Sequence, residues 1–365
     1  MTVEQLWQPV PGGSGTYVKE LARALLTRSD TDLVGVTARH AAQPIGDWAP
    51  PTGLRVVASR LPRPLLYETW TRLRGPRLPL GDSPRRVVHA TTWAVPPVRP
   101  PHALVVTVHD LAFLRDPGHF TRRGNGFFRR ALAVVREEAD AIIAVSSTTR
   151  DDCLAAGLAP ERVHVVPNGV AVPPTPPERV AELRQRLGLR RPYVLWCGTL
   201  EPRKNVPGLL RAFAHVVQDH DVDLVLAGPT GWGAATDVVA ALRELPEDRV
   251  HRVGPLAHAD LHAAYAGAAA FCFPSFWEGF GLPVLEAMAH GVPVVTSAGT
   301  STAEIGAGGG AVLVDPRDAG SIAEGLHRAL SSDESAAAVA RRHAATYSWA
   351  RCAEETTAVY RSVMQ

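Results

Sequence analysis

The clearest chemical pattern lies between residues 273 and 288, where the sequence reads FPSFWEGFGLPVLEAM. Its two carboxylates, Glu278 and Glu286, stand eight positions apart. Glu278 falls in a glycine-containing loop, whereas Glu286 falls in the opening turns of a helix that Pro283 starts. Carboxylates placed in this way can hold two ends of one extended ligand, and the glycines let backbone N–H groups reach a phosphate or sugar oxygen. Glu286 alone could merely complement the helix dipole, but that interpretation does not account for the loop.

A pair of cations follows another apolar run, in the segment CGTLEPRKN that ends at Asn205. Arg203 and Lys204 stand after a predicted strand and before a predicted helix over residues 206–217, with Asn205 as the N-cap. Two cations at such a position suit a diphosphate. A solvated basic pair is the alternative, and the position at the end of a strand disfavours it.

Two further segments carry weaker signals. The segment PGGSGTY places Gly12 and Gly13 before a predicted helix over residues 18–26, where backbone N–H groups can approach an anion. It is neither a complete GxGxxG nor a P-loop, so by itself it favours a plain turn from strand to helix. His109 ends the predicted strand 103–109 and can donate a hydrogen bond to a sugar hydroxyl or to a developing charge, with a capping or inter-domain hydrogen bond as the alternative.

Twelve short apolar runs predict the scaffold that positions these segments. The runs do not alternate with polar residues, as expected for parallel strands covered by helices on both faces. Helical segments separate them, which predicts an α/β protein of two doubly wound, Rossmann-like domains with a cleft between them. Ligands bind beyond the carboxyl ends of such strands, where the segments above lie. The predicted strands are 33–37, 54–58, 86–90, 103–109, 141–146, 163–167, 193–198, 223–227, 250–253, 269–273, 292–296 and 311–314.

Proline density marks the boundary between the two halves. Four prolines stand between residues 173 and 177, as in a stiff, extended linker. The sequence therefore predicts an N-terminal domain over residues 1–172 and a C-terminal domain over residues 173–348. Helical spacing of apolar residues predicts a terminal helix within residues 349–365, which we expect to pack back on the N-terminal domain.

Composition and pattern exclude several classes of protein. A net charge of only +2 argues against a dedicated nucleic-acid binder. The pairs Asp30/Asp32 and Asp221/Asp223 precede their strands, so we interpret them as solvated turn residues and expect no metal site. No complete GxGxxG follows a strand, which disfavours an NAD-dependent oxidoreductase. No secretory leader pattern opens the chain and no apolar run could span a bilayer, so we expect a cytoplasmic protein.

The glutamate segment resembles the Glu-x7-Glu motif of the family 4 glycosyltransferases, which are retaining enzymes of the GT-B fold. The similarity extends over nearly the whole chain. It is carried, in the order of the family, by PGGSGTYVKELARAL, VVTVHDLAF, ADAIIAVSSTTR, VHVVPNGV, GTLEPRKN, LVLAGP and EGFGLPVLEAMAHGVPVV. Within the family, GTLEPRKN and VTVHDLAF are most similar to bacterial mannosyltransferases of polysaccharide assembly. The resemblance makes the C-terminal domain the one that binds a nucleotide sugar and the N-terminal domain the one that binds an acceptor.

The resemblance also implies roles for the two glutamates. Glu278 would contact hydroxyls of the donor sugar, helped by backbone groups of Phe280, Gly281 and Leu282. Glu286 would hold the ribose of the nucleotide.

Other residues are implied at the diphosphate and near the reacting centre. Arg203 and Lys204 would neutralise the diphosphate, which Gly13, with Gly12, would approach from the N-terminal domain. His109 would hydrogen-bond the donor sugar. Further candidates at strand ends are Gly254, before a loop that would cover the base, and Asn168 and Ser146.

Two departures from the family pattern bear on these roles. Many members carry an arginine soon after the glycine that ends the first strand of the donor domain, whereas here Gly198 is followed by Thr199. Lys204 is therefore the safer assignment than Arg203. Only residues 2–6 precede the first glycine-rich segment, where the family has a full apolar strand. We expect either a short first strand or a chain start further upstream.

The resemblance implies transfer of a hexose with retention of configuration, without metal or cofactor, from a nucleotide diphosphate sugar to a glycan or lipid-linked acceptor. GDP-mannose is the favoured donor, and UDP-glucose and other UDP-sugars are the alternatives. A non-transferring enzyme of the same fold, such as an epimerase, is another alternative. A binding module without turnover is disfavoured by the intact His109, Lys204, Glu278 and Glu286.

Two basic segments bear on the acceptor. Residues 60–80 interleave five arginines with leucines and aromatic residues, and residues 122–136 combine arginines with Phe127 and Phe128. Such a surface suits an anionic membrane that carries a lipid-linked acceptor, which would make the protein peripheral at the inner face of the membrane. Core-facing helices with solvated arginines are the alternative.

Overall fold

A computed structural model describes residues 1–78, 85–231 and 235–365. The chain divides into two compact units, one made of Met1–Gly169 and Ser348–Gln365 and the other of Val170–Tyr347. The division therefore lies at 169/170 and not at the predicted 172/173. The Val170 N–H donates to the carbonyl oxygen of Tyr347 at 3.0 Å, which ties both ends of the second unit together. The C-terminal segment belongs to the first unit from Ser348 onward.

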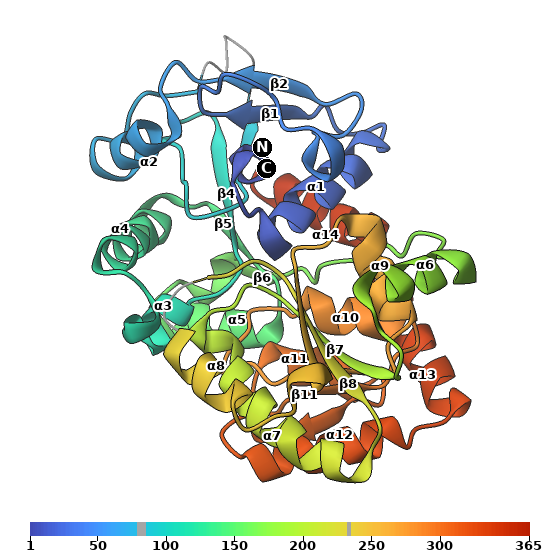
Figure 1. Ribbon diagram of the computed structural model, residues 1–365. Helices are drawn as coiled ribbons and strands as arrows, with labels where there is room; N and C mark the ends of the chain where they lie inside the picture. The colour runs from blue at the N-terminus through green and yellow to red at the C-terminus, as the bar shows by residue number, and fades with distance from the viewer. Residues whose placement is uncertain (79–84, 232–234) are drawn as a thin grey trace. The chain divides into compact units, whose positions relative to one another are not determined.

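The first unit is built on parallel strands that all lie within the predicted apolar runs. The strands β3, β4, β5 and β6 form one sheet in that order, and β1 pairs with β2 in a second (Figure 1). Strand β4 is buried throughout, as expected for a strand covered on both faces. The strands are β1 (Val34–Thr37), β2 (Arg55–Ala58), β3 (Val87–Ala90), β4 (Ala103–Val108), β5 (Ala141–Ala144) and β6 (Val163–Val165). The helices are η1 (Glu4–Trp7), α1 (Gly12–Leu26), η2 (Gly46–Trp48), α2 (Arg63–Arg72), α3 (Ala112–Arg115), η3 (Pro117–His119), α4 (Arg122–Glu138), α5 (Ser147–Ala155), η4 (Pro160–Arg162) and α14 (Trp349–Ser362).

The first residues of the chain join these two sheets. The Thr2 N–H donates to His89 O on β3 at 2.8 Å, and the Val3 N–H donates to Val36 O on β1 at 2.8 Å. Residues 1–3 thus act as a short central strand between β1 and β3. The strand order reverses at this segment, because the chain builds β1 and β2 on one side of it and β3 to β6 on the other.

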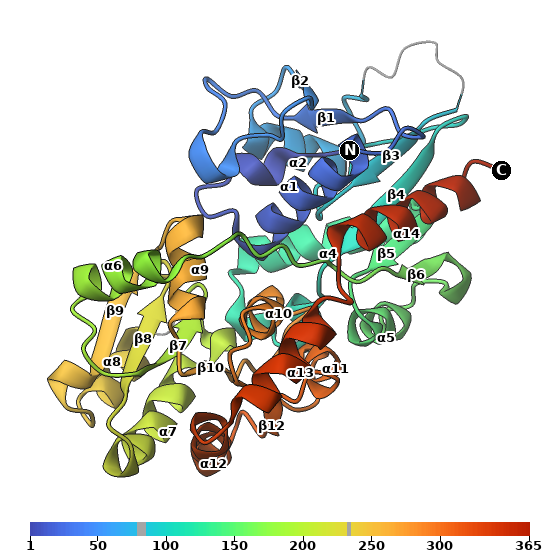
Figure 2. The same ribbon diagram turned by 90° about the vertical axis from the view of Figure 1, so that its right-hand side faces the viewer.

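Helix α1 begins earlier than predicted. It starts at Gly12 and not near residue 18, so Gly12 and Gly13 lie in its first turn. The backbone tolerates this start because Gly12 has φ +59°, a conformation that favours glycine. Helix α14 packs on α1 and β5, as Figure 2 shows, and contributes Trp349 beside Tyr17.

The second unit holds one six-stranded parallel sheet in the order β12-β11-β10-β7-β8-β9. Helices α7 and α12 lie side by side along one face, and α6 and α9 pair on the other (Figure 2). The strands are β7 (Tyr193–Cys197), β8 (Asp223–Ala227), β9 (Val250–Gly254), β10 (Ala270–Phe273), β11 (Val294–Ser297) and β12 (Val312–Val314). The helices are α6 (Pro177–Leu187), η5 (Pro202–Lys204), α7 (Val206–Asp219), α8 (Ala235–Leu242), η6 (Glu247–Arg249), α9 (His258–Ala266), α10 (Leu282–Ala289), α11 (Ser301–Ala307), α12 (Ala319–Leu330) and α13 (Glu334–Ala344).

The strand order of the second unit reverses between β7 and β10. From β7 the chain adds β8 and β9 on one side and then returns to add β10, β11 and β12 on the other. The loops that leave the carboxyl ends of β7 and β10 therefore lie at the switch point where doubly wound sheets bind ligands, and we call this strand-end region the crevice. These two loops carry Arg203, Lys204 and Glu278.

One of the aspartate pairs differs from its prediction as solvated turn residues. Asp223 is buried at the start of β8, where it contacts Arg191 at 3.3 Å and His251 at 3.1 Å. It is therefore a buried ion-pair partner and not a turn residue. Asp30 fits the prediction, since it lies at the surface and pairs with Arg28 at 2.8 Å and with Arg361.

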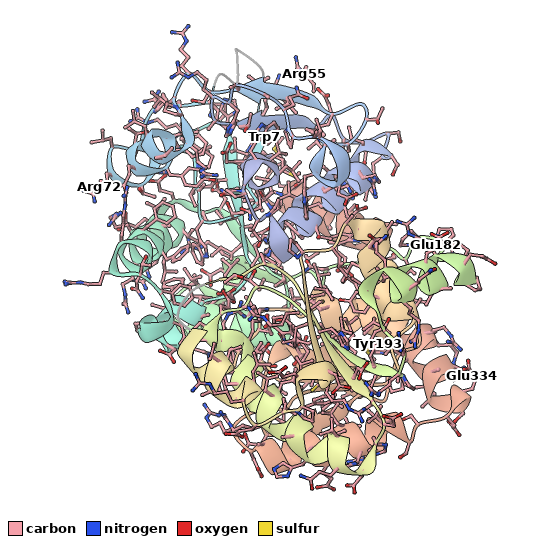
Figure 3. The ribbon with its side chains drawn as sticks, in the orientation of Figure 1. Trp7, Arg55, Arg72, Glu182, Tyr193 and Glu334 are labelled. Carbon is pink, nitrogen blue, oxygen red and sulfur yellow. The ribbon has the colours of Figure 1, made fainter. Side chains whose placement is uncertain are left out.

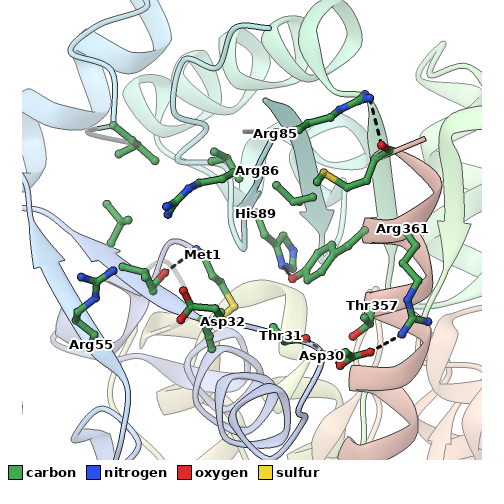
Figure 4. Close-up of a pocket in the computed structure, with 18 of the residues that line it drawn as sticks. Met1, Asp30, Thr31, Asp32, Arg55, Arg85, Arg86, His89, Thr357 and Arg361 are labelled. Atoms are coloured by element: carbon green, nitrogen blue, oxygen red, sulfur yellow. Dashed lines mark hydrogen bonds and ion pairs between the residues drawn. The ribbon is translucent and has the colours of Figure 1, made fainter. Parts of the chain in front are cut away.

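A cavity of about 530 Å³ lies in the first unit, at the amino ends of β1 and β3. Figure 4 shows Met1 and His89 on its wall, together with the ion pair between Asp30 and Arg361. The Met1 ammonium donates to Val34 O at 2.9 Å, and burial lowers its pKa to about 5. Because this cavity is at the amino ends of the strands, it is distinct from the strand ends that carry the predicted site residues.

Every helix within residues 1–78, 85–231 and 235–365 is too short or too polar to span a lipid bilayer.

Candidate functional site

The crevice between β7 and β10 brings three predicted residues into direct contact. The Lys204 ammonium lies 2.7 Å from Glu278 Oε1, and Arg203 Nη1 lies 3.0 Å from Glu278 Oε2. A backbone hydrogen bond of 2.9 Å from the Phe276 N–H to Arg203 O joins the same two loops. The two loops therefore form one structural unit, although 74 positions separate Lys204 from Glu278.

The charge of Glu278 is determined by its burial and by the two adjacent cations. Burial of Glu278 would by itself raise the pKa of the carboxyl group, but the adjacent Arg203 and Lys204 outweigh it and lower the pKa to about 2. Glu278 is thus ionised at neutral pH. Lys204 also lies 4.7 Å from the centre of the Phe273 ring, which holds the ammonium over an aromatic face. The cations are therefore ordered before any ligand arrives.

The loop that holds Glu278 is fastened by a residue that the sequence interpretation missed. The Ser301 hydroxyl, buried at the start of α11, lies 2.8 Å from Glu278 O and 3.0 Å from Phe280 O and can donate to either carbonyl. Serine is common near the start of helices, so only a tertiary contact could reveal this role.

The predicted backbone contributors stand at the start of α10. Gly281 has φ +100° and precedes Leu282, the first helical residue. A methyl group at Gly281 would also lie 2.6 Å from Thr302 Cγ2, so both conformation and space require glycine there. The first N–H groups of a helix lack partners within the helix, and here they follow Phe280 at the crevice. An anionic or hydroxyl oxygen can accept from them.

Asn205 occupies the predicted N-cap position of α7, but its side chain does not cap the helix. Its backbone is left-handed with φ +54°, and its side chain makes no capping hydrogen bond to α7. Instead its amide nitrogen donates to Pro274 O at 3.1 Å and to Pro316 O at 2.6 Å. Asn205 therefore ties the loops after β7, β10 and β12 together beneath the charged cluster.

Glu286 lies on α10, half-buried, and contacts a second unpredicted residue. The Tyr265 hydroxyl donates to Glu286 Oε2 at 2.9 Å. Burial raises the pKa of Glu286 to about 7, although the hydrogen bond from Tyr265 opposes the rise. The two glutamates have different partners, since Glu286 pairs with Tyr265 whereas Glu278 pairs with Arg203 and Lys204.

Gly254 ends β9 on the same edge of the sheet. Its carbonyl oxygen accepts from the Gly228 N–H at 2.8 Å, and its φ of +70° turns the chain toward α9. Gly228 in turn lies so close to Gly198 that a methyl group there would overlap the Gly198 carbonyl oxygen. Close backbone contacts thus join the carboxyl ends of β7, β8 and β9.

In the first unit, His109 follows β4, and one nitrogen of its ring already has a hydrogen-bond partner. His109 Nε2 lies 2.9 Å from Thr91 O, which can only accept, so Nε2 carries the proton. Burial lowers the pKa of His109, which keeps the ring neutral. The remaining ring nitrogen, Nδ1, is then an acceptor. His109 is therefore suited to accept a hydrogen bond from a hydroxyl group and not, as also predicted, to donate one.

Two weaker candidates of the first unit differ from one another. Ser146 caps α5, since its hydroxyl oxygen accepts from the Thr149 N–H at 3.0 Å, which gives it a structural role. Asn168 is buried after β6, and its side-chain oxygen has no hydrogen-bond partner in the described part of the chain.

The described residues contain no group of three or more His, Cys, Asp or Glu side chains that could hold a metal ion.

Two family models match this chain, one in its N-terminal part and one in its C-terminal part. Residues 11–173 match the family described as Glycosyltransferase Family 4, and residues 180–345 match the family described as Glycosyl transferases group 1. The chain belongs to glycosyltransferase family 4. It is therefore a glycosyltransferase enzyme, and its fold is GT-B with two Rossmann-like domains.

The names of the curated relatives refer to several sugars and acceptors. The chain is 31% identical over 325 residues to O-antigen chain mannosyltransferase B of Escherichia coli, covering 84% of this chain and 83% of the relative. It is also 31% identical over 394 residues to D-inositol 3-phosphate glycosyltransferase 1 of Catenulispora acidiphila, covering 97% and 91%.

Solved structures share the fold at lower identity. HepE of Anabaena in complex with UDP-glucose matches with a TM-score of 0.74 and 20% identity, over 99% of this chain and 98% of that one. Sucrose-phosphate synthase from Thermosynechococcus elongatus matches with a TM-score of 0.74 and 22% identity, over 96% and 93%.

Proposed function

We propose that this glycosyltransferase moves a hexose, most favourably mannose, from a nucleotide diphosphate sugar to a glycan or lipid-linked acceptor, with retention of configuration. The observation that carries the proposal is the cluster of Lys204, Arg203 and Glu278 in the crevice between β7 and β10. It supplies two ordered cations and a buried carboxylate where doubly wound sheets bind ligands. GDP-mannose is the proposed donor.

The proposed chemistry needs stabilisation of the departing diphosphate. Breaking the bond between sugar and phosphate builds negative charge on the leaving group and positive charge on the sugar. Lys204 and Arg203 would balance the first, and fixed cations cost no reorganisation as the charge develops. This supports transfer without a metal ion. Glu278, ionised and buried, would accept hydrogen bonds from sugar hydroxyls.

Binding of the donor changes the surroundings of Glu278 in this proposal. Each of its carboxylate oxygens pairs with one of the two cations. A diphosphate that attracts Lys204 and Arg203 would weaken these ion pairs and free lone pairs of Glu278 for the sugar. The cluster would thereby couple recognition of the diphosphate to recognition of the sugar.

The identity of the sugar rests on the relatives. O-antigen chain mannosyltransferase B and a further relative, MMP alpha-(1->4)-mannosyltransferase of Mycolicibacterium hassiacum, both carry mannose in their names. The alternative donor is UDP-glucose, the molecule bound in the HepE complex. His109 would accept a hydrogen bond from the donor sugar, and Gly12 and Gly13 would approach the diphosphate.

An anionic membrane is the proposed partner of the first unit. Four arginines and one glutamate line a hollow on α2 and α4, namely Arg72, Arg122, Arg123, Arg130 and Glu68. Glu68 pairs with Arg72 at 2.7 Å and with Arg130 at 3.5 Å, so the hollow keeps an excess of positive charge. Figure 3 shows Arg72 projecting outward from α2, near which Leu65 and Leu73 are exposed.

Two parts of the predicted basic surface need correction. Arg74 is bound by Glu138 and by backbone carbonyls, and Phe128 packs inward against Phe113. Residues 79 and 80 of the predicted segment lie outside the described residues.

Two experiments test the proposal. Product analysis by NMR, after incubation of α-linked GDP-mannose with a bacterial lipid extract, should show a new α-linked mannoside. A β-linked product would overturn retention, and release of free sugar or an epimerised nucleotide sugar would favour the non-transferring alternative.

The membrane proposal is tested by flotation. Vesicles containing anionic lipid should carry the protein upward, and neutral vesicles should do so less. Protein that stays at the bottom with both would overturn the membrane proposal.

A further inference from the structure

We infer that Tyr265 is a positioning residue for the nucleotide, acting through Glu286 and supported by Cys197, and that it tunes how tightly a ribonucleoside diphosphate binds. The inference rests on the proposed function, because it takes Glu286 as the group that holds the ribose.

The geometry is a chain of three buried or half-buried groups from three elements. Tyr265 on α9 is fully buried, and its hydroxyl donates to Glu286 Oε2 on α10 at 2.9 Å. Cys197 Sγ, at the end of β7, lies 2.9 Å from the same hydroxyl. Since the single proton of the Tyr265 hydroxyl goes to Glu286, the Cys197 thiol must be the donor in the second contact. The order is therefore Cys197 to Tyr265 to Glu286.

This order leaves Glu286 with one free side. Oε2 is held by Tyr265, whereas Oε1 makes no hydrogen bond or ion pair with a described residue, and the side chain is only half-buried. A carboxylate fixed at one oxygen loses little rotamer freedom when the other oxygen accepts from a ribose hydroxyl. Tyr265 thus orients the acceptor for the 2′- or 3′-hydroxyl group without touching the ligand.

The same contact controls the charge of Glu286. Burial raises the pKa of Glu286 to about 7, and the hydrogen bond from Tyr265 stabilises the ionised form and lowers it. The ionised carboxylate is the form that accepts two hydroxyl hydrogen bonds. Affinity for a ribonucleotide should therefore fall as the pH falls through about 7. Removal of the phenol hydroxyl should raise the pKa further, so that the fall begins at a higher pH.

Four neighbouring groups do not share this titration range. From α9, His262 is buried, which lowers its pKa to about 3, and from α10, His290 has its pKa lowered to about 4 by burial. From β7, burial raises the pKa of Cys197 to about 12, and the pKa of Tyr265 is raised well above its usual value. The other charged or titratable groups near α10 are His258 on α9, Lys204 after β7, Glu304 on α11, and Arg341 and His343 on α13.

The chain offers a matched control for the loss of one buried phenol hydroxyl. Tyr193 on β7, labelled in Figure 3, is also fully buried, and its hydroxyl donates to Ala264 O at 2.7 Å, next to Tyr265 in sequence. Tyr193→Phe therefore removes one buried hydrogen bond close to Tyr265 but leaves the hydrogen bond of Glu286 in place. Any general loss of stability should therefore be similar in Tyr193→Phe and Tyr265→Phe.

The test is calorimetric titration of the full chain with GDP and with UDP, and with their 2′-deoxy and 3′-deoxy forms, from pH 5.5 to 8.5. Relative to the wild type, Tyr265→Phe should bind the ribonucleotide about tenfold more weakly at pH 7 and move the midpoint of the pH dependence upward by about one unit. Tyr193→Phe should match the wild type within about twofold. In Glu286→Gln, the pH dependence of affinity should lose the part that Glu286 causes and keep the part due to the ligand phosphate. The double variant Glu286→Gln, Tyr265→Phe should show the same pH dependence as Glu286→Gln alone.

A second pair of variants covers the case in which Tyr265→Phe fails to fold. Cys197→Ala should shift the midpoint in the same direction by a smaller amount, and Cys197→Ser, which keeps a donor, should restore it. A midpoint shared by the wild type, Tyr265→Phe and Cys197→Ala would overturn the inference while leaving the proposed function intact. Failure of the wild type to bind either nucleotide at any pH would instead overturn the proposed function.

Discussion

Lys204 is one of two lysines in the chain, and its contacts are unlike those of the other. Both side chains are largely buried, but Lys204 lies 2.7 Å from Glu278 and over the face of Phe273, whereas Lys19 lies on α1 of the first unit, 3.9 Å from Glu20. An ammonium group held in this way is ready to stabilise a departing diphosphate.

We predict that Lys204→Met lowers the rate of sugar transfer by about 10²- to 10³-fold, because one preorganised charge opposite the leaving group is lost. The fold should survive, since Arg203 remains 3.0 Å from Glu278 and keeps that carboxylate paired. The measurement is kcat with saturating donor, beside the midpoint of thermal unfolding. Lys19→Met is the control and should keep wild-type activity, and equal activity of the two variants would contradict the assignment.

At the scale of residues, the sequence predicted the types and order of the site residues better than their contacts. Glu278, Arg203 and Lys204 could be recognised because each follows an apolar strand. Tyr265, Ser301 and the true role of Asn205 could not, because each acts through a contact with a residue far away in sequence. A buried tyrosine in a helix has the same sequence pattern whether or not its hydroxyl faces a carboxylate.

Three loops of the second unit depend on Asn205. Its amide group donates to Pro274 O and Pro316 O, and both carbonyl groups follow strands of the sheet that carries the crevice. Its left-handed backbone is tolerated by asparagine better than by most residues.

We predict that Asn205→Ala lowers the free energy of unfolding by about 2–4 kcal/mol, because two buried carbonyl groups lose their donor and alanine is strained at positive φ. Asn205→Gly should be affected less, since glycine removes the strain but not the loss of hydrogen bonds. Differential scanning calorimetry of the full chain measures both. A pair of variants with unchanged midpoints would show that the loops hold together without this amide.

At the scale of elements, the apolar runs predicted the twelve strands of the described part of the chain. The central strands β4, β7, β8 and β10 are buried throughout and are therefore largely apolar, whereas the edge strands β2 and β9 are partly exposed. The start of α1 was misplaced by about six residues, since glycine content argued for a loop. In the structure, Gly15 faces Pro11 and Trp48, where a larger side chain would overlap. Gly15 thus serves close packing of the first helical turn and Gly12 its positive φ, neither of which composition alone distinguishes from a flexible loop.

The whole molecule repeats one design twice. Each unit is a parallel sheet whose strand order reverses once, between β7 and β10 in the second unit and around residues 1–3 in the first. The candidate residues gather at the carboxyl ends of strands in both units, as doubly wound sheets require of a ligand site. The sequence predicted this architecture, whereas the boundary at 169/170 depends on tertiary contacts that no local pattern marks, such as the close approach of Gly169 to Trp349.

The central claim is that this chain transfers mannose without a metal ion, and its most direct test is incorporation of radiolabel from GDP-mannose and from UDP-glucose into a bacterial lipid and polysaccharide extract, with and without EDTA. We predict that label enters the extract from GDP-mannose, unaffected by EDTA, and not from UDP-glucose, with no incorporation by Lys204→Met beyond about one hundredth of the wild type. Incorporation from UDP-glucose alone, loss of incorporation in EDTA, or equal incorporation by Lys204→Met would contradict the account.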